Sequence, residues 1–139
     1  MRIRTTFALL ALITPAGFCA PSAASACTCD PPPSLAHARD SADGAFLGAL
    51  VSLGMDYERK QSVFTFEVKR VFKGTFPARV RVLSYWTGCA SSFARDTDYI
   101  VFTHPFDGNH TTNQCAGNRP ERESPDWQKQ LGPGTPPAP

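Results

Sequence analysis

The alternation of apolar and polar residues is clearest between residues 62 and 73. There Phe64, Phe66 and Val68 alternate with polar neighbours, the period-two pattern of a strand with one buried face. Val71 breaks the phase of this alternation, which is the effect of an extra residue in a β-bulge. The pattern therefore predicts a bulged strand here. Comparable apolar stretches predict further strands at 45–55, 78–85, 98–103 and 111–115.

Turn and cap signals surround these strands. Gly48, inside the first strand, indicates a bulge or a close approach between backbones. Ser34 is a suitable N-cap for a short helix that reaches about residue 41, and residues 127–131 are expected to form one further helical turn. Residues 132–139 are rich in proline and glycine and have few apolar side chains. We therefore expect the polar, Pro-rich C-terminal tail, 119–139, to be largely disordered.

One short helix followed by five strands, some of them bulged, predicts a mainly β fold. The best match is a five-stranded closed barrel of the oligonucleotide/oligosaccharide-binding (OB) type with short flanking helices. An immunoglobulin-like sandwich is the alternative, but that fold needs about seven strands, and the pattern supplies too few.

The first 26 residues have the organisation of a secretory signal peptide. Two cations precede a short apolar run at 7–13, and the small residues at 24–26 form a cleavage site. Cleavage there makes Cys27 the first residue of a secreted chain whose domain we place at 27–118. The alternative is lipidation of Cys27, which would tether the protein to a membrane; the residues that precede this cysteine do not favour it.

Charge and cysteine content narrow the classes of function. Removal of 26 of the 139 residues leaves 113, with 12 basic and 12 acidic side chains. A neutral domain without Lys/Arg clusters lacks the electrostatic footprint of a nucleic-acid-binding or membrane-binding protein. Four cysteines remain, at 27, 29, 89 and 115, and an even number predicts two disulfides in an oxidising extracellular or periplasmic compartment. Three connectivities are open, and the cysteine spacing does not match a zinc site.

Several segments together resemble the netrin-like module, and within it the N-terminal domain of the tissue inhibitors of metalloproteinases. The Cys27-Thr28-Cys29 sequence at the predicted terminus is the most specific of them. The resemblance covers residues 27–117. The matching segments are 27–29 with 31–32, 42–48, 64–68 with 71–74, residue 89, 99–102 and 112–115.

The resemblance implies an OB-type barrel, the disulfides Cys27–Cys89 and Cys29–Cys115, and inhibition of a zinc metallopeptidase. In such an inhibitor the α-amine and carbonyl oxygen of Cys27 would chelate the zinc of the protease, Thr28 would enter its specificity pocket, and Cys29 would be the second anchor. Thr87 and Gly88, beside Cys89, would form the neighbouring contact ridge. Asp30 departs from the family pattern, in which a small or apolar residue occupies this position.

Two other classes of function compete with protease inhibition. A non-inhibitory netrin-like module that binds a protein or glycan is the alternative, with Tyr85 and Trp86 as contacts. An enzyme is disfavoured because His37, His104 and His110 show no H-E-x-x-H motif and no i,i+4 pairing, and the serines at 91 and 92 lack a nucleophile elbow. We therefore expect a secreted, monomeric protein that is not an enzyme and that needs no cofactor. A metallopeptidase is its expected partner; nucleic acid is not, and a membrane only if Cys27 is lipidated.

Overall fold

The computed structural model describes residues 27–139, so the predicted signal peptide and its cleavage site lie outside the described residues. The described part of the chain begins with an extended segment and enters the predicted helix, α1 (Leu35–Ser41). Ser34 caps this helix as expected, because its hydroxyl accepts a hydrogen bond from the His37 N–H at 3.1 Å. None of the helices within residues 27–139 is long and apolar enough to cross a membrane.

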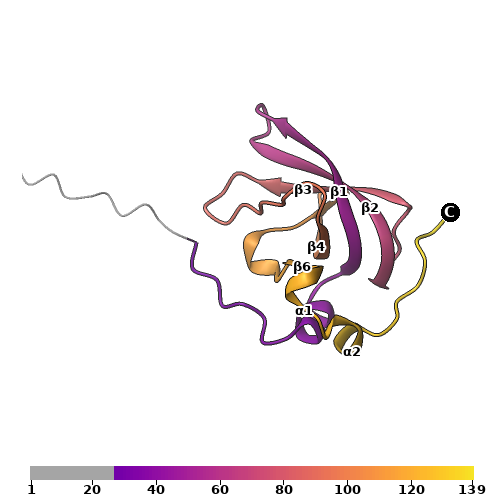
Figure 1. The fold of residues 1–139 in the computed structure, drawn as a ribbon. Helices are drawn as coiled ribbons and strands as arrows, with labels where there is room; N and C mark the ends of the chain where they lie inside the picture. Colours follow the sequence, from indigo (N-terminus) through magenta and orange to yellow (C-terminus); the bar gives the residue numbers. More distant parts are fainter. Residues whose placement is uncertain (1–26) are drawn as a thin grey trace, which may run out of the picture.

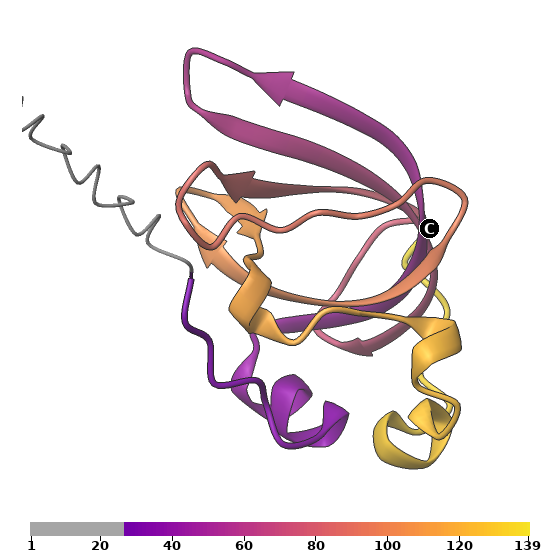
Figure 2. The same ribbon diagram turned by 60° about the vertical axis from the view of Figure 1, so that its left-hand side comes forward.

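Five strands form a ring in which each is hydrogen-bonded to the next, in the order β1, β2, β3, β5, β4 and back to β1 (Figures 1 and 2). β3 and β5 are parallel, and the other pairs are antiparallel. β6 pairs with β4 outside the ring and completes a mixed six-stranded sheet. The prediction of a mainly β fold with short helices and two disulfides is confirmed. The strands are β1 Gly44–Asp56, β2 Gln61–Lys73, β3 Arg79–Tyr85, β4 Asp98–Phe106, β5 Asn109–Thr111 and β6 Arg119–Pro120.

Irregularities in the β1–β2 pairing explain the phase change in the sequence. The register shifts three times, and two of the shifts leave an extra residue on β2, at 69 and at 72. Phe64, Phe66 and Val68 are buried, and after the first of these shifts Val71 takes the next buried position. At Gly48 the two backbones approach so closely that an added Cβ would lie 2.8 Å from the carbonyl oxygen of Glu67.

Two apolar clusters lie on opposite sides of the ring wall. The first draws on β1 to β4 and so lies where these strands face one another, inside the ring. The second packs α1 and α2 against the outer side of β1 and β4. Successive residues of β4 alternate between the two clusters, which is why Tyr99, Ile100, Val101 and Phe102 are all apolar.

The prediction of a strand at 111–115 was wrong. β4 continues to Phe106, and β5 follows after the two-residue turn Asp107-Gly108, whose φ angles are 50° and 71°. Positive φ at both positions is the signature of a type I′ hairpin turn. Residues 114–116 form a 3₁₀ helix, η1 (Gln114–Ala116), instead of a strand.

The C-terminal tail differs from the predicted disorder. It contains β6, a 3₁₀ turn (η2, Glu121–Glu123) and the expected helical turn, α2 (Trp127–Leu131). Trp127 and Leu131 join the outer apolar cluster, and α1 and α2 lie next to each other (Figure 1). Beyond α2, Thr135 exchanges two backbone hydrogen bonds of 2.8 Å with Val71. The tail therefore covers a stretch of β2 that β3 leaves unpaired, a role that its composition does not reveal.

Candidate functional site

The Cys27-Thr28-Cys29 segment is held against one end of the ring by both disulfides. Cys27 is bonded to Cys89, and Cys29 to Cys115, with Cα separations of 5.1 and 5.2 Å. This is the pairing that the family resemblance implies. The two bonds are neighbours, since the four sulfur atoms lie within 4.8 Å of one another. Two adjacent crosslinks place the start of the described chain beside the loop after β3 (Figure 2).

Contacts further along the segment also fix its direction. The Arg119 guanidinium donates a hydrogen bond of 3.4 Å to the Pro32 carbonyl oxygen. Gly117 lies so close to the Pro32 ring that an added Cβ would be 2.9 Å from Cγ. A conformationally restricted proline run, clamped in this way, limits the motion of the residues that precede it.

The backbone atoms of Cys27 have no partner among residues 27–139. Neither its nitrogen nor its carbonyl oxygen takes part in a hydrogen bond there, while the side chain is half-buried in the disulfide. Exposure alternates along the segment: Thr28 and Asp30 are exposed and Cys29 is half-buried. The two backbone atoms and the Thr28 side chain are thus available to a partner, whereas the sulfurs anchor the segment.

The loop after β3 lies directly beside this segment. The Thr87 N–H bonds to the Tyr85 carbonyl oxygen at 2.8 Å, and the Thr87 hydroxyl accepts a hydrogen bond from the Cys89 N–H at 3.3 Å. Thr87 and Gly88 are both exposed. The structure therefore brings together two segments that are about 60 residues apart in the chain. They carry the six predicted protease-contact residues, which are Cys27, Thr28, Cys29, Thr87, Gly88 and Cys89.

An exposed aromatic cluster adjoins this loop. Tyr57 lies at the tip of the β1–β2 hairpin, and Trp86 follows β3. Their rings make an edge-to-face contact with centroids 5.2 Å apart, and Met55 lies beside Tyr57. Their exposed fractions are 38%, 72% and 55%. The sequence indicated Trp86 as a possible contact but not Tyr57, because nothing in a polar hairpin loop shows which residue will meet the tryptophan.

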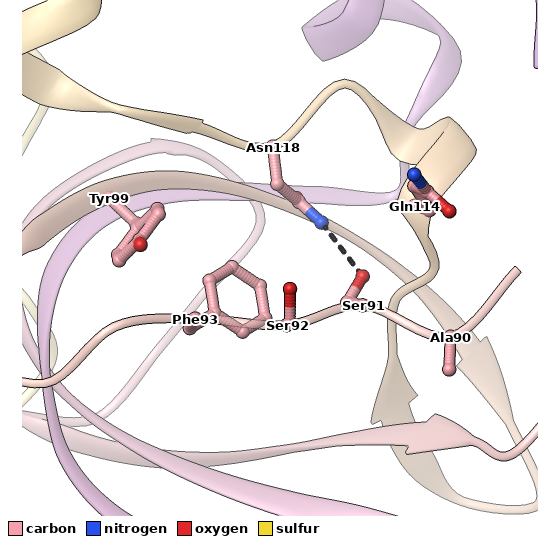
Figure 3. Close-up of a pocket in the computed structure, with 7 residues that line it drawn as sticks. All are labelled: Ala90, Ser91, Ser92, Phe93, Tyr99, Gln114 and Asn118. Atoms are coloured by element: carbon pink, nitrogen blue, oxygen red, sulfur yellow. Dashed lines mark hydrogen bonds between the residues drawn. The ribbon is translucent and has the colours of Figure 1, made fainter.

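Behind the two disulfides, one amide side chain organises the connecting segments. Asn118 accepts a hydrogen bond from the Phe102 N–H at 2.8 Å and donates to the Thr112 hydroxyl at 2.7 Å. It also donates to the Asn113 carbonyl oxygen and to the Ser91 hydroxyl (Figure 3). Sequence reasoning missed this residue, because a single asparagine after a glycine is typical of any turn.

The histidines do not form a metal site with one another. His104 Nδ1 lies 3.0 Å from an Asp43 carboxylate oxygen, and the His110 ring packs at a tilt of 40° against the buried ring of Phe76, with centroids 4.8 Å apart. Partial burial lowers the pKa of His110. His110 is therefore a half-buried residue of β5 and not a solvated loop residue.

Within residues 27–139, the only cluster of three or more potential metal ligands is formed by the four cysteines. Their sulfurs are already engaged in disulfide bonds, so the clustering follows from the crosslinks. Two disulfides are typical of proteins in an oxidising, extracytoplasmic compartment.

No family model matches the chain, and no curated protein is significantly similar to it.

Proposed function

We propose that this protein is a secreted inhibitor of zinc metalloendopeptidases with a netrin-like, OB-type closed barrel, and that mature Cys27 is its zinc-binding terminus. The observation that supports this most is that Cys27 combines unpartnered backbone atoms with a side chain fixed by a disulfide. The nitrogen and carbonyl oxygen of Cys27 are unpartnered within the described chain, while its sulfur is bonded to Cys89.

Coordination chemistry accounts for the two backbone atoms. A catalytic zinc has three protein ligands and a fourth position that is open to water or substrate. After cleavage at residue 26, the α-amine of Cys27 would have a pKa near 8, so that part of it is neutral and able to bind metal at pH 7. The amine nitrogen and the carbonyl oxygen of the same residue close a five-membered chelate ring with the zinc and displace the water that hydrolysis needs.

Rigidity is the second part of the mechanism. A flexible terminus loses much of its binding free energy to ordering, on the order of 1 kcal/mol for each immobilised group. The adjacent disulfides and the clamp at Pro32 impose that order before binding. Thr28 then projects from the held backbone toward the specificity pocket of the protease, and Thr87 and Gly88 extend the contact on the other side of Cys27.

The aromatic cluster supports a contact surface wider than the terminus alone. Exposed aromatic side chains are enriched at protein interfaces, where they supply large contact areas at small entropic cost. Met55, Tyr57 and Trp86 are three of the five large apolar side chains that are well exposed in residues 27–139. The tip of the β1–β2 hairpin and the loop after β3 lie on the side of the ring where the described chain begins (Figure 2).

The test is a titration of the mature protein, beginning at Cys27, against a panel of purified zinc endopeptidases. A matched protein carries one additional alanine before Cys27. We expect stoichiometric inhibition of at least one protease by the first protein. The extension should weaken inhibition by about 100-fold or more, equivalent to roughly 2.7 kcal/mol. Equal inhibition by both proteins would exclude the terminus as the zinc ligand.

A second candidate function is a non-inhibitory netrin-like module that binds another protein or a glycan through the aromatic cluster. The exposure of Tyr57 and its contact with Trp86 favour this alternative. It predicts that partner binding survives the N-terminal alanine and falls when Tyr57 is replaced by alanine. If the protein is a metallopeptidase inhibitor, the alanine extension should weaken partner binding more than the replacement of Tyr57 does.

A further inference from the structure

A hollow of about 210 Å³ lies beside the two disulfides, between the segment that follows Cys89 and the residues around Cys115. Ser91, Ser92 and Phe93 line it from one side, Gln114 and Asn118 from the other, and Tyr99 from within the ring wall. In Figure 3 the hydroxyls of both serines point toward the side from which Asn118 approaches. Three separate segments of the chain thus converge on one small space.

The lining carries hydrogen-bonding groups and no charge. Among residues 27–139, the Ser92 hydroxyl and the Gln114 side-chain amide make no hydrogen bond, and both residues are exposed. The Tyr99 hydroxyl accepts a hydrogen bond from the Ala94 N–H at 2.9 Å, which leaves its own hydrogen free to be donated. A ligand in the hollow therefore meets both donors and acceptors but no ionic group.

The walls are fixed before a ligand arrives. Phe93 packs edge-on against Phe64, Phe66 and Tyr99, with ring centroids 4.8 to 5.1 Å apart. Asn118 is held by short hydrogen bonds to Phe102 and Thr112 and by longer, shared contacts of its amide nitrogen with Asn113 and Ser91. A preformed wall reduces the ordering cost of binding, and a partly exposed aromatic ring supplies an apolar face beside the polar groups.

We propose that this hollow binds one ring of a neutral sugar. Its volume is below the roughly 300–1,000 Å³ of sites for drug-sized ligands, which suits a ligand of a single ring. A sugar ring presents hydroxyls that both donate and accept around its edge, and apolar C–H groups on its face. The hydroxyl and amide groups match the edge, and the Phe93 ring matches the face. The absence of charged groups from the lining disfavours phosphate and carboxylate ligands.

The experiment uses the ¹⁵N-labelled mature protein, with both disulfides, and NMR titration with glucose, galactose, mannose and N-acetylglucosamine. At least one sugar should shift the amide signals of residues 90–93 and 114–118, with a dissociation constant of about 1 to 10 mM, as expected for a few hydrogen bonds in a shallow site. Inorganic phosphate serves as the charged probe and should leave these signals in place.

Two substitutions and one control locate the site. Ser92→Leu places an apolar side chain in the hollow and should weaken binding by tenfold or more, by about 1.4 kcal/mol. Ser52→Leu, at an exposed serine of β1, is the matched control and should bind as the wild type does. Gln114→Ala removes only one hydrogen-bonding group and should weaken binding by about threefold.

Three results would each overturn the proposal. The first is that no sugar shifts these signals at about 50 mM, and the second is that phosphate alone shifts them. The third is that Ser92→Leu binds the sugar as tightly as the wild type. The titration contains no protease, so its outcome is independent of the proposed inhibition.

Discussion

Removal of either disulfide is predicted to cost about the same stability, because the two crosslinks close the same short loop. With Cys27–Cys89 in place, Cys29 and Cys115 are joined by the two residues from 27 to 29 and the 26 residues from 89 to 115. The chain-entropy model gives about 3.5 kcal/mol for closing this loop of about 28 residues. If the loop were counted as the full 86 residues between Cys29 and Cys115, the same model would give about 4.6 kcal/mol, but that count neglects the Cys27–Cys89 crosslink.

The two variants to compare are Cys29→Ser/Cys115→Ser and Cys27→Ser/Cys89→Ser. Denaturant unfolding can be followed by the fluorescence of Trp127, which is only 8% exposed in the folded protein, and extrapolated to water. Both variants should lose about 3.5 kcal/mol of unfolding free energy and still fold at 25 °C if the wild-type stability is well above that value. The two variants should differ in how strongly they inhibit the protease, because only Cys27→Ser/Cys89→Ser releases residue 27 from its crosslink.

Two results would refute this reasoning. A loss below about 1 kcal/mol in both variants would mean that the crosslinks do not constrain the unfolded chain as the structure implies. Free thiols in the Cys29→Ser/Cys115→Ser variant, detected by titration under denaturing conditions, would show that Cys27 is not paired with Cys89. The assay therefore tests the pairing and its energetic consequence separately.

Further predictions concern the β1–β2 contact, pH dependence and the specificity pocket. Gly48→Ala would bring a methyl group to 2.8 Å from a backbone oxygen and should lower the free energy of unfolding by about 1–3 kcal/mol in denaturant titrations. Gly54→Ala, whose added Cβ meets nothing closer than 3.9 Å, should be within about 0.5 kcal/mol of the wild type, and an equal loss in both would contradict the close approach. Because burial lowers the folded-state pKa of His110, the unfolded chain binds the proton more readily, so stability should fall as the pH drops below about 6.5. In thermal melts between pH 7.5 and 5, His110→Gln should flatten this dependence, and an unchanged slope would assign it to other groups. Thr28→Gly should weaken inhibition of deep-pocket proteases more than of shallow-pocket ones, whereas an unchanged inhibition constant for both would place the specificity contact elsewhere.

The sequence was most informative where a single local interaction or constraint determines the structure. Ser34 caps α1 because a serine before an apolar helical repeat has a local backbone partner. The change of phase at Val71 predicted the bulges, because an extra residue in a strand is what moves the following apolar side chains to the other face of the sheet. Cysteine parity predicted two disulfides, while their partners followed only from the family resemblance.

Long-range contacts account for what the sequence did not predict. Thr135 is ordered because β2 has unpaired backbone groups at Val71, and no local property of a Pro-rich tail reveals that edge. Tyr57 belongs to the exposed aromatic cluster only because the β1–β2 hairpin brings it to Trp86. Asn118 gains its structural importance from three segments that are separate in the sequence.

The most direct test of zinc chelation by Cys27 is the affinity of the mature protein for one inhibited protease in its zinc-loaded and zinc-free forms. If the amine and carbonyl oxygen bind the metal, removal of zinc should weaken the complex by about 100-fold or more in a calorimetric titration. Acetylation of the α-amine should cause a similar loss with the zinc-loaded form and little further loss without zinc. Equal affinity for the two forms would contradict the account.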